Sequence, residues 1–161
     1  MDWIKQNILW KKRFYFLLAF SGLLFSVYHF STLRYGDQAF LEYLNDNPYG
    51  YEATVSYYEY GDRPMRYVEL GDASKPLIVF VHGAPSSSAF WEDLLVDTTL
   101  LQNARLLAVD RPGYGFSGFG RPEISVRKQA EAIAPILKKK RALHDQIIVH
   151  GSSYGGTVTA R

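Results

Sequence analysis

Residues 151–155 of this 161-residue chain read GSSYG, so that a serine stands midway between two glycines. They follow a short apolar run and precede a segment that we expect to open a helix. Glycines two positions before and after a serine let the backbone turn sharply and expose one hydroxyl above a sheet. The spacing therefore predicts Ser153 as a nucleophile and Gly151 and Gly155 as the small residues of the turn. Ser152 occupies the variable position and is not the candidate.

A second loop, residues 82–85 (HGAP), follows another apolar run. A tight turn at this place can direct a backbone N–H group toward the space above the serine. We expect the amides of Ala84 and Tyr154 to form an oxyanion hole, since the proline that follows has no N–H group. His82 and Gly83 are expected to support the loop without transferring protons.

A third loop, residues 110–117 (DRPGYGFS), closes a further apolar run. Its glycines and proline favour a tight loop, and open α/β sheets bind ligands at this kind of strand end. Asp110 and Arg111 are expected to fix the loop and not to perform chemistry.

The three loops each follow a run typical of a buried strand. Residues 77–81, 106–109 and 147–149 are short, continuous and rich in β-branched side chains, which suits strands covered on both faces. Segments of helical length, at about 89–102 and 124–142, lie between them. This alternation predicts an α/β fold with crossover helices.

Two further strand-like runs precede these, at residues 53–60 and 65–70, and a turn with Gly61 and Pro64 joins them. They predict an antiparallel hairpin. The expected architecture is thus a hairpin followed by parallel strands with crossover helices.

The three motifs, in this order and spacing, resemble the α/β-hydrolase superfamily. The branch related to epoxide hydrolases, haloperoxidases, proline iminopeptidases and esterases shares the HG-x-P and D-R-P-G-x-G-x-S patterns. The resemblance covers residues 55–161 and implies the N-terminal half of an α/β-hydrolase sheet. Epoxide hydrolases and haloalkane dehalogenases of this branch carry Asp at the nucleophile position. Ser153 therefore implies hydrolysis of a carboxylic ester, amide, lactone or similar bond in a small-molecule substrate.

The resemblance also implies a catalytic triad whose acid and histidine follow the serine in the chain. No Asp, Glu or His follows Ser153, and His29, His82, His144 and His150 offer no credible general base. The sequence predicts the N-terminal portion of a hydrolase, cut short by annotation, gene damage or incomplete sequencing. The alternative is a non-catalytic binding member, or an inactive fragment, of the same fold.

Charge and composition exclude several other classes. Residues 1–34 hold five basic residues against one acid, whereas the rest of the chain holds 13 basic and 15 acidic residues, so that no nucleic-acid partner is expected. The absence of cysteine excludes disulfides, thiolate metal sites and a cysteine nucleophile. We expect neither a metal nor another cofactor.

Residues 14–30 carry no formal charge and predict a single-pass transmembrane anchor that contacts the lipid bilayer. A basic cluster at 11–13 precedes them, which would place residues 1–13 in the cytoplasm and the hydrolase domain outside the cytosol, on the periplasmic side in a bacterium. Residues 31–51 then form a juxtamembrane linker and short helix, and residues 52–161 a partial hydrolase domain. A cleaved signal peptide, an interfacial helix and a buried core helix are the alternatives for the apolar run.

Overall fold

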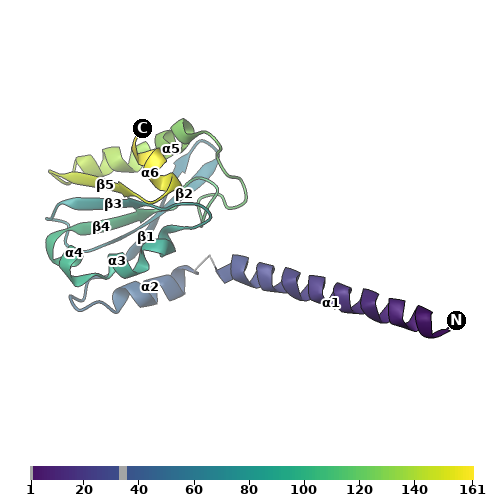
Figure 1. The fold of residues 1–161 in the computed structure, drawn as a ribbon. Helices are drawn as coiled ribbons and strands as arrows, with labels where there is room; N and C mark the ends of the chain where they lie inside the picture. Colours follow the sequence, from purple (N-terminus) through teal and green to yellow (C-terminus); the bar gives the residue numbers. More distant parts are fainter. Residues whose placement is uncertain (1, 33–35) are drawn as a thin grey trace. The chain divides into compact units, whose positions relative to one another are not determined.

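The computed structural model describes residues 2–32 and 36–161, and the side chains of residues 10–28 and 36–161. It divides into two compact units, Met1–Arg34 and Tyr35–Arg161. The first unit consists of one helix, α1 (Asp2–Thr32), as Figure 1 shows.

The transmembrane anchor predicted over residues 14–30 is wrong. In the described part of the chain, no helix combines the length and the apolar character needed to cross a membrane. A span needs about 20 apolar residues, whereas this run has 17, which include Ser21 and Ser26, and a basic cluster directly precedes it. The predicted single-pass membrane localisation, with the hydrolase domain outside the cytosol, is wrong for the same reason, and the expected bilayer contact loses its basis.

The second unit is built on a mixed sheet of five strands in the order β1-β2-β4-β3-β5. The hairpin strands β1 and β2 are antiparallel, β2 is antiparallel to β4, and β3 is parallel to both β4 and β5. The α/β architecture and the predicted hairpin are therefore confirmed (Figure 1). The strands are β1 (Thr54–Tyr60), β2 (Arg63–Leu70), β3 (Leu77–Val81), β4 (Arg105–Val109) and β5 (Ile147–Gly151).

Short helices cover one face of the sheet: α2 (Asp37–Asn45), η1 (Ser88–Trp91), α3 (Glu92–Leu95) and α4 (Thr98–Asn103). The helix predicted over residues 89–102 is thus three short pieces. The break before α4 has a local cause. The Asp97 side chain accepts a hydrogen bond from the Leu100 amide at 2.8 Å, and this cap starts a new helix at Thr98.

Helix α2 belongs to the core of this unit, although the sequence placed it in a linker. Phe40 and Leu44 lie one helical turn apart and are buried in a cluster with Val68, Phe80 and Leu106 of the sheet. Burying two large apolar side chains stabilises the docking of α2 by roughly 1.5–3 kcal/mol each. The helix is therefore anchored to the sheet that carries the candidate site.

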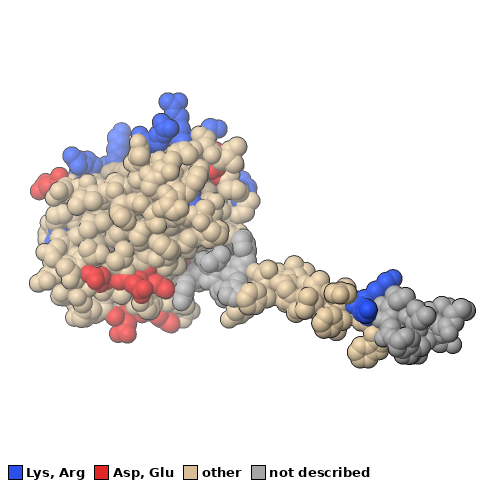
Figure 2. Space-filling view, viewed as in Figure 1, with Lys and Arg blue, Asp and Glu red and all other residues tan. Residues whose placement is uncertain are grey.

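Helices α5 (Val126–Arg141) and α6 (Tyr154–Thr159) cover the other face. The Ser125 hydroxyl caps α5, and the buried Ile133 and Ile136 pack on the sheet with Val158 of α6. Figure 2 shows Lys and Arg gathered over α5 and Asp and Glu over the opposite side, near α2 and α3. The two outer faces of this unit therefore carry opposite charge.

Candidate active site

Ser153 lies in the turn between β5 and α6, with φ 50° and ψ −122°. It is the one residue other than glycine with a positive φ in the described part of the chain. This backbone conformation costs an L-residue on the order of 1–3 kcal/mol and persists only where the surroundings enforce it. The Ser153 side chain is exposed and makes no capping hydrogen bond, so that its hydroxyl is presented to solvent at the end of the sheet.

Close packing of the flanking glycines enforces this turn. A Cβ atom on Gly151 would lie 2.5 Å from the carbonyl carbon of Gly155, and one on Gly155 would lie 2.2 Å from the carbonyl oxygen of Val81. Such distances exclude any side chain at either position. The turn is therefore pressed against the carboxyl end of β3, where the loop of residues 82–85 begins.

That loop runs directly beside the serine. A Cβ atom on Gly83 would lie 3.1 Å from Ser153 Cβ and 3.7 Å from Ser153 Oγ. The Ser152 amide donates to the Val81 carbonyl at 3.0 Å, which joins the two loops through the backbone. The amides of Ala84 and Tyr154 donate no hydrogen bond to any group within the described part of the chain. Two unpaired N–H groups thus occur on the two loops that meet at the serine.

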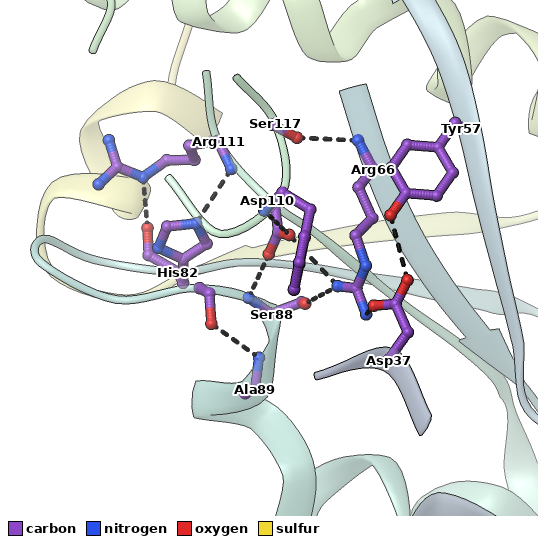
Figure 3. Close-up of polar contacts among 11 residues, drawn as sticks. Asp37, Tyr57, Arg66, His82, Ser88, Ala89, Asp110, Arg111 and Ser117 are labelled. Atoms are coloured by element: carbon purple, nitrogen blue, oxygen red, sulfur yellow. Dashed lines mark hydrogen bonds and ion pairs between the residues drawn. The ribbon is translucent and has the colours of Figure 1, made fainter. Parts of the chain in front are cut away.

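His82 connects the loop after β3 with the loop after β4 (Figure 3). The ring is fully buried, its Nε2 accepts a hydrogen bond from the Arg111 amide at 3.0 Å, and its Nδ1 lies 2.6 Å from the Gly83 carbonyl oxygen. This pattern assigns the proton to Nδ1. Burial lowers the pKa of His82 to about 4, which keeps the ring neutral at pH 7. Both ring nitrogens are therefore occupied in bridging the loops.

Asp110 holds the loop after β4 and the start of η1. Its buried carboxylate accepts from the Ser88 amide at 2.6 Å and from the Phe116 amide at 2.9 Å. A Cβ atom on Gly115 would lie 2.2 Å from Asp110 Oδ2, so that the loop can wrap around the carboxylate only with glycine there. The side chain fixes two loops through backbone donors.

A buried arginine on β2, which the sequence analysis did not identify, completes this network. Arg66 is 2% exposed, and its Nη1 donates to Ser88 Oγ at 2.7 Å and lies 3.2 Å from Asp110 Oδ2. Its Nη2 lies 2.8 Å from Asp37 Oδ1 at the start of α2, and Tyr57 donates to the same carboxylate at 3.1 Å. Figure 3 shows Arg66 between the two carboxylates. In the sequence, the one sign of this role was a basic residue within a largely apolar strand. Such a residue does not show which acids it pairs with.

His144 and His150 form no hydrogen bond with the serine and have other partners. His144 Nδ1 lies 2.8 Å from the Lys75 carbonyl oxygen, just before β3 begins. His150 is exposed, and its ring meets Trp91 edge-on with centroids 5.4 Å apart. The side chain of His29 lies outside the described residues. No hydrogen bond joins Ser153 to a histidine, and no cluster of three or more His, Asp or Glu residues able to hold a metal occurs, within the described parts of the chain.

A family model and similar proteins place this chain among known families. Residues 78–161 match the model of the alpha/beta hydrolase family. A haloalkane dehalogenase of Mesorhizobium japonicum is 41% identical over 66 residues, which are 41% of this chain and 20% of that protein. The haloalkane dehalogenase DatA of Agrobacterium tumefaciens is 27% identical with a TM-score of 0.56, over 71% of this chain and 35% of that one.

The fold extends to other hydrolases. An epoxide hydrolase of Vigna radiata shares the fold at 20% identity and a TM-score of 0.56, over 66% of this chain and 32% of that one. The chain thus spans about a fifth of the length of the curated dehalogenase and about a third of each of these two solved structures.

Proposed function

Since the chain belongs to the alpha/beta hydrolase family, we propose that it carries the nucleophile and oxyanion hole of a serine hydrolase. In this proposal Ser153 attacks the carbonyl carbon of a small carboxylic ester, amide or similar substrate. The backbone amides of Ala84 and Tyr154 bind the oxyanion, and His82, Gly83 and Asp110 support the surrounding loops.

The observation that carries the proposal is the strained, exposed Ser153. A positive φ at a serine costs conformational free energy. The Ser153 hydroxyl makes neither a capping bond nor any other hydrogen bond within the described chain. The unpaired amides of Ala84 and Tyr154 supply donors on the two loops that meet there. Removing one oxyanion donor from a serine hydrolase typically costs about 100- to 1,000-fold in kcat.

The proposed reaction has two steps. Ser153 Oγ bonds to the carbonyl carbon while a general base takes its proton, and the tetrahedral oxyanion collapses to an acyl-enzyme as the alcohol or amine leaves with that proton. Water then attacks the acyl-enzyme and releases the acid. Among the described side chains, none of His82, His144 and His150 forms a hydrogen bond with Ser153, so we propose that a part of the protein outside these 161 residues supplies the base, together with the triad acid.

Haloalkane dehalogenation is the second candidate, because two of the similar proteins have that activity in their names. The side chain at position 153 argues against it. A carboxylate that displaces a halide forms an ester, which water can cleave, whereas a serine would form an ether, which water does not cleave under the same conditions. The haloalkane dehalogenases that the sequence resembles carry Asp at the position of Ser153. A serine nucleophile therefore suits acyl transfer better than dehalogenation.

A fluorophosphonate probe tests the proposal on the complete product of the gene. We expect covalent labelling of Ser153, located by mass spectrometry of the peptide, and loss of labelling in Ser153→Ala. Ser152→Ala is the matched control, since it removes the neighbouring hydroxyl and should keep the label. Equal labelling of the wild type and Ser153→Ala would reject Ser153 as the nucleophile.

Turnover separates the three functions. Release of nitrophenol from a short-chain nitrophenyl ester that depends on Ser153 supports acyl transfer and rejects the binding-only alternative. Release of halide from a haloalkane, without ester turnover, would instead support dehalogenation. A folded protein that performs neither reaction and takes no label would favour the non-catalytic reading.

A further inference from the structure

Arg111 is buried completely, and no ion pair joins it to a carboxylate in the part of the chain that the structure describes. Its Nη1 donates to Gln129 Oε1 at 2.7 Å, and its Nη2 has no hydrogen-bond partner there. A buried cation without a counterion is costly, because its charge is removed from water without a compensating charge. The fold therefore holds an uncompensated positive charge at this place.

The surroundings of the guanidinium locate it behind the candidate oxyanion hole. Arg111 Nε donates to the His82 carbonyl at 2.7 Å, and this carbonyl belongs to the peptide group that leads into Gly83. The guanidinium carbon also lies 4.9 Å from the centroid of the Tyr154 ring and 4.4 Å from that of Tyr114. One side chain thus contacts both loops that border Ser153, and Figure 3 shows its bond to the His82 carbonyl.

A second contact closes this arrangement. A Cβ atom on Gly155 would lie 2.5 Å from the His82 carbonyl oxygen, so the start of α6 is packed against the same oxygen that accepts from Arg111. A shift of the arginine would therefore move the residues on both sides of the serine. Small displacements of oxyanion donors have large effects, since their benefit depends on distances of about 2.7–3.1 Å to the developing charge.

We propose that Arg111 is a positioning residue for the reaction: its guanidinium holds the His82–Gly83 peptide group in place and, through the Tyr154 ring, the start of α6, and its positive charge stabilises the oxyanion. The inference rests on the proposed function. Asp110 only fixes the loops, by accepting hydrogen bonds from backbone amides. The role proposed for Arg111 differs, because its positive charge acts on the negative charge of the oxyanion, which exists only during the reaction. Ground-state substrate binding does not need that charge.

The test uses the complete gene product and a nitrophenyl ester. Arg111→Met should lower kcat by about 10- to 100-fold with KM nearly unchanged, as expected for an interaction made only in the transition state. Arg111→Lys should give an intermediate kcat, because it keeps the charge but loses the planar, multiply bonded group. A boronic acid inhibitor, which becomes a tetrahedral anion on Ser153, should bind more weakly in Arg111→Met by the same factor as kcat falls.

Arg105→Met is the matched control, since it removes a partly buried arginine that bonds to Glu69 and the Gly71 carbonyl, away from the serine. It should lower the melting temperature and leave kcat unchanged. A folded Arg111→Met or Arg111→Lys with the wild-type kcat overturns the inference, and the lysine variant decides it if the methionine variant does not fold. Absence of Ser153-dependent turnover in the wild type would instead remove the proposed function itself.

Discussion

The two ends of strand β4 hold buried charge in different ways. At its start, the Glu69 carboxylate of β2 is bonded by Lys140 of α5 and lies 3.3 Å from Arg105 Nη2, so that one acid is shared by two bases. Just after its end, Asp110 pairs with Arg66, whereas the next residue, Arg111, has no carboxylate partner in the described chain. The first arrangement joins a helix to the sheet, and the second lies against the strained turn.

The pKa values follow the same division. Burial acts to raise the pKa of Glu69, but hydrogen bonds from Lys140 and Arg105 outweigh it and hold the pKa below its ordinary value. At the other end, burial lowers the pKa of His82 and keeps the ring neutral. A charged cluster in which each base has an acid partner therefore lies at the start of β4. The site end instead combines the buried Arg66–Asp110 ion pair with the neutral His82 and with Arg111, which has no carboxylate partner in the described chain.

The largest effect is expected from filling the turn at the site end. Gly155→Ala places a Cβ atom 2.2 Å from the Val81 carbonyl oxygen, which the backbone cannot avoid without moving β3 from α6. We expect a loss of about 4 kcal/mol in the free energy of unfolding, measured by chemical denaturation. Gly36→Ala is the control, since a Cβ atom there meets nothing within 4 Å. Similar midpoints for both variants would show that the turn is not tightly packed.

The next effect is a pH dependence that arises at His82. The pKa of His82 is about 4 in the folded protein, whereas its ordinary value is 6.5. Between pH 4 and pH 6.5 the unfolded chain therefore binds a proton at this residue and the folded chain does not. The free energy of unfolding should therefore fall by roughly 3 kcal/mol as the pH drops from about 6.5 to about 4. His82→Gln removes this titration and should flatten the slope in that window. An unchanged slope in the variant would assign the pH dependence to other groups.

The smallest effect is expected at the compensated end. Lys140→Met leaves Glu69 with Arg105 as its remaining base, so we expect a loss of about 2 kcal/mol, less than for a buried acid left without any partner. Lys139→Met, which changes the exposed neighbour, should alter stability by less than about 0.5 kcal/mol. In the folded Lys140→Met variant, labelling of Ser153 by the fluorophosphonate should stay at the wild-type level. A loss of labelling would show that the two ends are coupled.

Much of the fold could be predicted from local patterns. The runs at 77–81, 106–109 and 147–149 became β3, β4 and β5, since continuous β-branched segments favour strands covered on both faces. The hairpin and α5 followed in the same way. The membrane anchor was wrong because a 17-residue uncharged run with two serines resembles a span in charge but not in length and hydropathy. The strand order could not be predicted, because no local pattern tells that β4 lies between β2 and β3.

The sequence by itself indicated which residues could form the site, since a serine midway between two glycines, which have no Cβ atom, is typical of a sharp turn that exposes the hydroxyl. Ser153 as the nucleophile, with Ala84 and Tyr154 as oxyanion donors, stays a prediction. Only the tertiary structure decided what surrounds them: the burial of Arg66 between two carboxylates, the bridging tautomer of His82 and the placing of Arg111 beneath both loops. These contacts join residues far apart in the chain, and their partners follow from how the strands and helices pack and not from spacing along the sequence.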